Sequence, residues 1–170
     1  GQLSVAKGVA DLARAIKRFS TGDGAAPAQW LFVGDGPLRA MLEELPTCRL
    51  AGAVDHAALR DYYDAADALF LPSHQEGLPT VTLEAGSRGL PVAATDVGSV
   101  RDVVRADTGW LLRPRNDDDL LQAMRAAAAD SETLGPRGDR LFQIVRTTYS
   151  AAANAATVRE RYATLCKDLG

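Results

Sequence analysis

The sequence predicts an α/β domain built on a parallel sheet with helices on both faces. Two observations lead to this prediction: short apolar runs alternate with amphipathic stretches, and turns rich in Gly and Pro separate them. Strands that alternate with helices are typical of parallel sheets, which bind ligands at the carboxyl ends of their strands. We therefore expect the functional residues in the loops that follow the strands.

In the first half of the chain, helical spacing of apolar residues predicts a helix over residues 9–19. A short buried strand over residues 30–33 ends at the turn Gly34-Asp35-Gly36-Pro37. Helix and strand then repeat. The further elements expected here are helices over residues 37–45 and 57–66 and strands over residues 49–54 and 69–71.

The second half continues the alternation and then becomes helical. We expect strands over residues 91–95 and 109–112, a helix over residues 99–105, and a long helix that Asn116 or Asp117 caps. The acidic triplet 117–119 fits a helix start, where acids meet the positive end of the dipole. The tail to residue 170 reads as one or two more helices, broken near Gly135-Pro136.

The first expected element is a helix, whereas a doubly wound sheet would begin with a strand. We therefore expect residues 1–170 to form a single domain that lacks its first strand. The composition, 46% hydrophobic and 24% charged, is sufficient for one domain with a real core.

Charge and cysteine usage limit the classes of partner. A net charge of −3 offers no excess of positive charge to a nucleic-acid backbone or an anionic membrane, so the expected partners are small molecules and not nucleic acid. Two cysteines far apart in sequence, Cys48 and Cys166, without a signal-like start or a long apolar span, predict a cytoplasmic location. Peripheral attachment to the inner face of the membrane stays open.

Two carboxylates, Glu76 and Glu84, are separated by seven residues in the stretch that joins the strand at 69–71 to a helix. Gly77 and Pro79 turn the backbone, and Pro79 suits the first helical position because its missing N–H would be unpaired there. The free N–H groups and dipole of a helix start attract anions. A phosphate beside carboxylates that bind hydroxyls is typical of a nucleotide-sugar site.

Other candidate residues have ordinary interpretations beside the functional one. Asp35 fits plain turn chemistry, and Lys7 is either a solvated lysine or a cation for a diphosphate. His56 is expected to precede a helix and His74 to border the cleft, and neither has a metal-ligand companion at useful spacing, so no metal site is predicted. No Gly-x-Gly-x-x-Gly follows a first strand, which disfavours a dinucleotide-dependent dehydrogenase.

A series of short motifs extends over nearly the whole chain. In order they are Lys7-Gly8, Phe32-Val33-Gly34-Asp35-Gly36-Pro37-Leu38, Leu50-Ala51-Gly52-Ala53-Val54, Ala66-Asp67-Ala68-Leu69-Phe70-Leu71-Pro72-Ser73, residues 76–85, Gly89-Leu90-Pro91-Val92, Asp96-Val97-Gly98 and Thr108-Gly109-Trp110-Leu111-Leu112. With these motifs the sequence resembles the C-terminal, donor-binding half of retaining GT-B glycosyltransferases of family 4, a group that includes glycogen synthases and bacterial mannosyltransferases. The resemblance implies a Rossmann-like fold and transfer of a hexose from a UDP- or GDP-linked donor.

The resemblance also implies a role for each matching position. Glu84 would accept hydrogen bonds from the donor ribose, Glu76 would hold the donor sugar or assist the reacting centre, and Lys7 would neutralise the leaving diphosphate. Backbone amides of the turn before the helix would cradle the sugar and the distal phosphate, and no protein-bound metal or other cofactor is expected. The expected nucleotide-sugar-binding positions are Gln2, Lys7, Gly34, Val54, Glu76, Gly77, Leu78, Pro79, Thr80 and Glu84, with Lys7 and Glu76 as the catalytic residues.

One position departs from the family pattern. The family has an Arg five residues before the Lys, and here Gln2 supplies neither charge nor a bidentate fork. The N-terminal half, which in the family supplies the site for a sugar or lipid-linked acceptor, is expected to be absent, so this chain alone would bind a donor without completing transfer. Two alternatives stay open: a related GT-B phosphorylase or nucleotide-sugar epimerase, and a degenerate, non-catalytic binding module.

Overall fold

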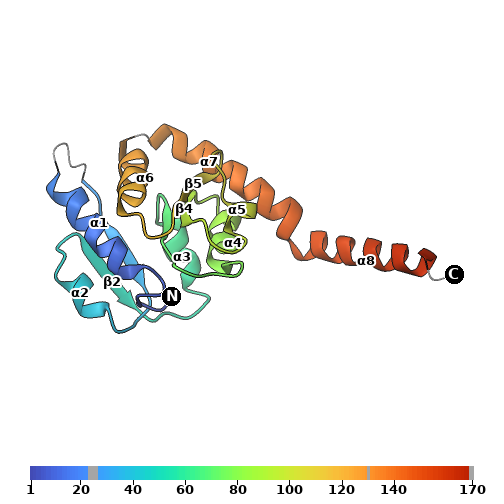
Figure 1. Cartoon of the computed structure of the whole chain (residues 1–170), viewed down its shortest axis with the longest axis horizontal. Helices are drawn as coiled ribbons and strands as arrows, with labels where there is room; N and C mark the ends of the chain where they lie inside the picture. The colour runs from blue at the N-terminus through green and yellow to red at the C-terminus, as the bar shows by residue number, and fades with distance from the viewer. Residues whose placement is uncertain (23–26, 130, 169–170) are drawn as a thin grey trace.

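The computed structural model describes residues 1–22, 27–129 and 131–168, in which strands alternate with helices as far as α6 (Figure 1). The strands are β1 (Trp30–Val33), β2 (Cys48–Gly52), β3 (Leu69–Leu71), β4 (Val92–Thr95) and β5 (Gly109–Leu112). The helices are α1 (Val9–Thr21), α2 (Arg39–Glu43), α3 (Leu59–Asp64), α4 (Thr80–Ser87), α5 (Val100–Val103), α6 (Asp117–Ala129), α7 (Ser131–Ile144), the π-helix η1 (Val145–Tyr149) and α8 (Ala151–Asp168).

The strands pair in parallel, which confirms the predicted architecture, and they are divided between two sheets. One sheet has the order β1-β2 and the other the order β3-β4-β5. The sheets meet through side chains: the Trp30 and Phe70 rings lie edge to face, with their centroids 5.5 Å apart. This contact makes the apolar core continuous between the two sheets.

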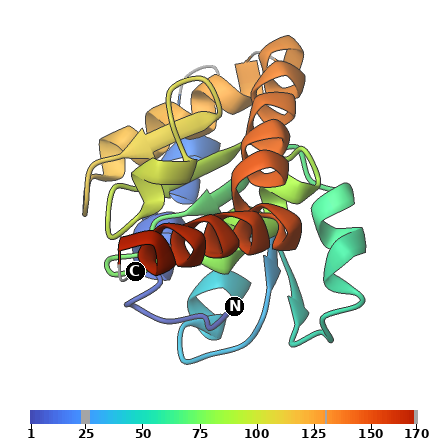
Figure 2. The ribbon, with the colours of Figure 1, turned by 90° about the vertical axis from the view of Figure 1, so that its right-hand side faces the viewer.

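Helices cover both faces of the larger sheet, as predicted (Figures 1 and 2). All four residues of β4 are buried, with Ala93 in a core that includes residues of α1 and α6 and with Val92 and Ala94 in a core that includes residues of α4, α5 and α7. Successive side chains of a strand point to opposite faces, so a strand covered on both sides is apolar throughout.

The C-terminal helices correct one prediction. α7 continues through Pro136, so the expected break near Gly135-Pro136 is wrong. The proline removes one backbone hydrogen bond, but fully buried Leu141, in the next part of the same helix, anchors it to the core. The chain changes direction at Ser150, whose backbone is extended and whose Oγ accepts a hydrogen bond from the N–H of Ala153 at 3.1 Å.

Several expected elements are longer than the observed ones. β2 ends at Gly52, which leaves Val54 outside the strand, and α2, α3 and α5 are each shorter than predicted. The last two residues of the predicted tail helix, 169 and 170, lie outside the described residues.

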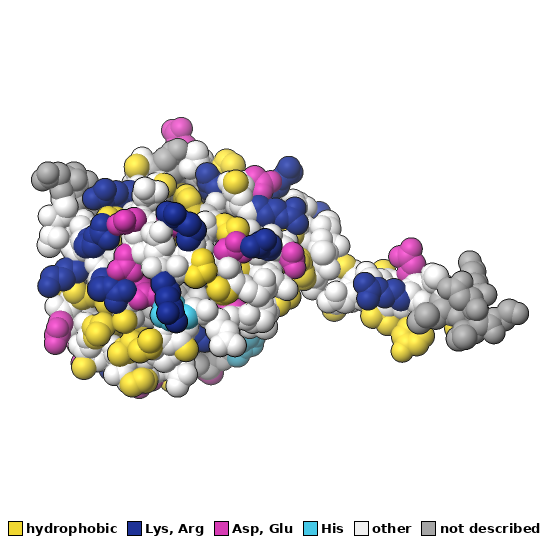
Figure 3. All heavy atoms as spheres, viewed as in Figure 1, with side chains coloured by type: hydrophobic (Ala, Val, Ile, Leu, Met, Phe, Trp, Pro, Cys, Tyr) yellow, Lys and Arg dark blue, Asp and Glu magenta, His cyan; other side chains and the backbone are white. Residues whose placement is uncertain are grey.

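α8 projects away from the body of the molecule (Figures 1 and 3). Its Val158 and Tyr162 side chains are 53% and 67% exposed, so this helix is not stabilised by burial against the domain. Of the helices within the described ranges, none is both long enough and apolar enough to cross a bilayer.

The packing of α7 depends on a close approach of two backbones. A Cβ atom at Gly138 would lie 1.7 Å from the carbonyl oxygen of Gly89, whereas a Cβ atom at Gly135, one turn earlier in the same helix, would have no atom within 4 Å. Substitution of Gly138 therefore tests packing, whereas substitution of Gly135 tests helix propensity.

We expect Gly138→Ala to lower the free energy of unfolding by about 1–3 kcal/mol, because the added methyl group forces α7 away from Gly89. Gly135→Ala is the matched control. Its gain in helix propensity, at most about 1 kcal/mol, is opposed by crowding against Pro136, so its effect should be small. Urea denaturation of both variants measures the difference, and equal effects would contradict the close packing of α7.

Candidate functional site

The two predicted catalytic residues form an ion pair. Lys7 Nζ lies 2.7 Å from Glu76 Oε1, although the residues are far apart in sequence. The Glu76 side chain is only 10% exposed, while that of Lys7 is 41% exposed. A carboxylate that is withdrawn from water needs a cation or hydrogen-bond donors, and here Lys7 meets that need while its ammonium group stays accessible to solvent.

The backbone beside Lys7 is fixed against the end of β3. Gly8 has a φ of +68°, and a Cβ atom there would lie 1.9 Å from the carbonyl oxygen of Pro72. The N–H of His74 donates to the carbonyl oxygen of Ala6 at 2.9 Å. A glycine is therefore required after Lys7, both for its left-handed conformation and for the close approach.

The backbone beside Glu76 is fixed by a close contact with the loop between β4 and α5. Gly98, in the loop between β4 and α5, has a φ of +56°, and a Cβ atom there would lie 2.2 Å from the Glu76 carbonyl oxygen. The N–H of Ser99 donates to the carbonyl oxygen of Gly77 at 2.9 Å. Gly98 thus positions the predicted site, a role that the sequence analysis did not assign to it.

The start of α4, the helix that follows Glu76, has the features of an anion-binding site. α4 starts at Thr80, one residue later than expected, and Pro79 is the N-cap residue with extended backbone. Pro79 provides no side-chain hydrogen bond to the first turn of α4. Gly77, Leu78 and Thr80 are exposed at this corner, so the helix start faces solvent.

A buried hydroxyl lies at the start of the same loop. Ser73 is 1% exposed, and its Oγ has no hydrogen-bond partner among the described residues. Buried polar atoms usually have partners, so an unpaired one beside a candidate site indicates a place for a ligand or a water molecule.

Glu84 lies on the same side of the domain as Lys7. Burial lowers the pKa of the Gly1 α-amino group, the Lys7 charge lowers it further, and the Glu84 charge raises it, so both side chains act on this one group. Glu84 Oε2 accepts a hydrogen bond from the Tyr63 hydroxyl at 2.8 Å. Lys7 and Glu84 thus lie within electrostatic range of the same group, whereas the grouping of Lys7, Glu76 and Glu84 as one site stays a prediction.

The remaining predicted positions lie around this edge. Gly34 follows β1, has a φ of +135°, and donates its N–H to the carbonyl oxygen of Gly52 at 2.7 Å. Gln2 is exposed in the segment that runs beside Gly34, and Val54 lies two residues beyond the end of β2. In the part of the chain that the structure describes, no hydrogen bond or ion pair joins Gln2 or Val54 to the Lys7–Glu76 pair.

A second polar network lies beside the site. His74 Nε2 and Asp11 Oδ2 are 2.5 Å apart, and Arg14 bridges Asp11 and Asp117. Burial raises the pKa of Asp11, but hydrogen bonds from His74 and Arg14 lower it more, so the net shift is downward. This network ties α1 to the start of α6, and His74 is therefore held by protein groups.

The acidic triplet has a further role that the sequence analysis did not assign. Asp117, Asp118 and Asp119 pair with Arg14, Arg18 and Arg113, respectively. Of the two predicted caps, Asn116 is the one observed: its Oδ1 accepts hydrogen bonds from the N–H groups of Asp118 and Asp119. On the face shown in Figure 3, acidic and basic side chains are accordingly interspersed.

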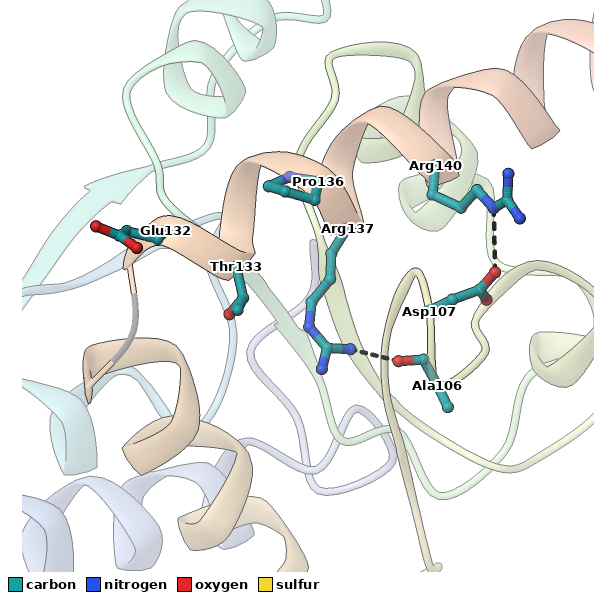
Figure 4. A pocket seen from close by; sticks show the side chains of 7 residues that line it. All are labelled: Ala106, Asp107, Glu132, Thr133, Pro136, Arg137 and Arg140. Carbon is teal, nitrogen blue, oxygen red and sulfur yellow. Dashed lines mark hydrogen bonds and ion pairs between the residues drawn. The ribbon is translucent and has the colours of Figure 1, made fainter.

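A hollow in the surface lies away from these residues. It has a volume of about 620 Å³ and lies beside α7 and the amino end of β5, opposite the carboxyl ends of the strands (Figure 4). Arg137 donates to the carbonyl oxygens of Ala106 and Gly109, and Arg140 pairs with Asp107. Both arginines therefore already contact protein groups. Within the described ranges, no group of three acidic, His or Cys side chains is arranged to hold a metal.

The parallel strands and the helices on both faces of the larger sheet define a Rossmann-like domain, and its structural neighbours are GT-B glycosyltransferases. The sequence profile described as Glycosyl transferases group 1 matches residues 1–130. The chain belongs to this family.

Relatives and solved structures agree with that assignment. The putative teichuronic acid biosynthesis glycosyltransferase TuaC of Bacillus subtilis is 32% identical over 167 residues, which cover 98% of this chain and 41% of the relative. Sucrose-phosphate synthase from Thermosynechococcus elongatus has a TM-score of 0.81 at 26% identity, over 99% of this chain and 44% of that one. Anabaena HepE, solved in complex with UDP, has a TM-score of 0.82 at 19% identity, over 96% of this chain and 47% of that one. The chain thus spans less than half the length of each of these proteins.

We expect Gly98→Ala to lower the free energy of unfolding by about 3 kcal/mol, because it combines left-handed strain with a clash against the Glu76 carbonyl. Gly89→Ala is the matched control: Gly89 also has a left-handed φ, +69°, but a Cβ atom there would meet nothing within 4 Å. Its cost should be about 1–2 kcal/mol. Urea denaturation compares the two, and equal losses would argue against a tight contact between Gly98 and the Glu76 loop.

Proposed function

We propose that this chain is the donor-binding domain of a retaining glycosyltransferase, which transfers a hexose from a nucleotide sugar to an acceptor. The observation that carries the proposal is the Lys7–Glu76 ion pair at 2.7 Å, placed beside the start of α4. Family membership supports glycosyl transfer, and the UDP bound by HepE supports a uridine or similar nucleotide as the carrier.

Lys7 is assigned to the diphosphate of the donor. An ammonium group has three N–H donors, so Lys7 can keep its contact with Glu76 while it donates to a phosphate oxygen. When the bond between the sugar and the diphosphate breaks, negative charge grows on the leaving group, and a fixed cation stabilises that charge. The amides of Gly77, Leu78 and Thr80 offer further donors to the sugar and the distal phosphate.

Glu76 and Glu84 are assigned to hydroxyl groups. Glu76 uses Oε1 for Lys7, which leaves Oε2 for a hydroxyl of the donor sugar. Glu84, on α4, is assigned to the ribose hydroxyls. Gly34 and Val54 would border the nucleotide, and Gln2 would lie near the diphosphate without charge.

Completion of transfer is assigned to a larger protein. Because the chain spans only 41% of its TuaC relative, we propose that the remaining part of such a protein supplies the site for a sugar or lipid-linked acceptor. We place this enzyme in the cytoplasm, at the inner face of the membrane when its acceptor is a lipid; composition is the support for this location.

A second candidate function is a binding module that does not catalyse transfer. Gln2 favours it, because the loss of one of two phosphate-binding cations weakens stabilisation of the leaving diphosphate. Donor turnover by a two-half protein that contains this domain separates the candidates, since the binding module would hold the donor without consuming it.

We expect Glu84→Ala to weaken UDP binding by about 1–3 kcal/mol, because hydrogen bonds to a charged group are lost. Glu44→Ala, at an exposed position after α2, is the control and should bind UDP like the wild type. Calorimetric titration with UDP, GDP and ADP measures the loss and identifies the preferred base. An unchanged affinity in a folded Glu84→Ala protein would remove Glu84 from the ribose site.

We expect Gln2→Arg to tighten UDP binding and to make it more sensitive to salt, because it restores a cation near the diphosphate. Gln122→Arg adds the same charge at an exposed position on α6 and serves as the control. Titrations at low and high ionic strength would test this. If both variants behave alike, position 2 does not contact the phosphates.

A further inference from the structure

Tyr63 is the polar side chain that holds Glu84 in place. Its hydroxyl donates to Glu84 Oε2 at 2.8 Å in a partly buried position, and its ring packs against the core that includes Leu90 and Val92. Burial raises the pKa of the Tyr63 phenol, and the Glu84 charge raises it further. The phenol therefore keeps its proton throughout the physiological range and acts toward Glu84 as a donor.

The hydrogen bond leaves most of the Glu84 carboxylate available. A carboxylate has about four lone-pair sites, and a tyrosine hydroxyl occupies one of them. Oε1 and the second lone pair of Oε2 remain for other donors. Two acceptors on one rigidly held carboxylate match the two neighbouring hydroxyls of a ribose, and fixing the side chain beforehand reduces the entropy lost on binding.

Attachment of α3 to α4 does not depend on this hydrogen bond alone. Asp64, the neighbour of Tyr63, pairs with Arg88, which lies one turn after Glu84. Removal of the Tyr63 hydroxyl should therefore release the Glu84 side chain while the two helices stay in contact. This redundancy makes a positioning role distinguishable from a purely structural one.

We propose that Tyr63 is a positioning residue for ribose recognition, which holds the Glu84 carboxylate so that its free lone pairs accept both ribose hydroxyls of the donor. The inference rests on the proposed function and adds a residue from a different helix to it. Tyr63 acts through Glu84 and has no contact of its own with the nucleotide.

The test is Tyr63→Phe, titrated with UDP and with 2′,3′-dideoxy-UDP, which lacks both hydroxyls. We expect UDP affinity to fall about tenfold, the effect of roughly one hydrogen bond, while dideoxy-UDP affinity changes less than about twofold. In a Glu84→Ala background, Tyr63→Phe should produce no further loss. Tyr62→Phe, the adjacent tyrosine, is the matched control and should bind both ligands like the wild type.

Each outcome decides the inference. Equal losses for UDP and dideoxy-UDP, or additive losses in the double variant, would overturn it while the donor-binding proposal stands. Asp64→Asn weakens the other contact between α3 and α4; if it reproduces the UDP-specific loss, helix docking and not the Tyr63 hydroxyl is responsible, and the inference fails. If the wild type binds none of UDP, GDP or ADP, the proposed function fails first and the inference fails with it.

Discussion

The ion pair between Lys7 and Glu76 is the interaction on which the site depends. Glu76 is only 10% exposed, so its carboxylate needs a charged partner, and that partner lies 69 residues earlier in the sequence. The pair can form only if the loops that carry the two residues reach the same strand end. Gly8 and Gly98 make this possible, because each approaches a neighbouring carbonyl oxygen more closely than any side chain would allow. Close backbone packing at the two glycines therefore places the two charged side chains within reach of each other.

The carboxylate of Glu84 is held by a neutral hydrogen-bond donor. Glu84 is part of α4, and the position of α4 is set by buried Thr82, Ala85 and Gly86 on its core side. The Tyr63 hydroxyl then fixes the polar end of the Glu84 side chain. One acid is thus oriented by a cation and the other by a neutral donor. The difference suits separate tasks, since a cation can be shared with a phosphate, whereas a phenol leaves the acceptor capacity of the carboxylate largely intact.

The sequence predicted much of the fold and less of the site. Strands 30–33, 69–71 and 109–112 were predicted with their observed bounds, because apolar runs between turn residues carry a local signal. The break at Pro136 was wrong because helix propensity omits tertiary packing, which at Leu141 outweighs the proline. Lys7, Glu76 and Glu84 were selected from motifs; the contact between Lys7 and Glu76 is observed, and the roles of all three stay predictions. Tyr63 and Gly98 act across the fold, through contacts with residues about twenty positions away in sequence, and no local pattern identifies such contacts.

In the proposed donor site, Gln2 leaves Lys7 as the assigned phosphate-binding cation. In the proposed site, Glu76 and Glu84 are assigned to hydroxyl groups on either side of the diphosphate, and Lys7 is the cation that contacts Glu76. A diphosphate placed there meets repulsion from both acids, which a single shared ammonium offsets only in part. The N–H groups at the start of α4 must then provide much of the attraction, and they do so without a formal charge. If the proposed donor binding relies on these backbone donors, it depends on the exact placement of the 77–80 turn, against which Gly98 packs.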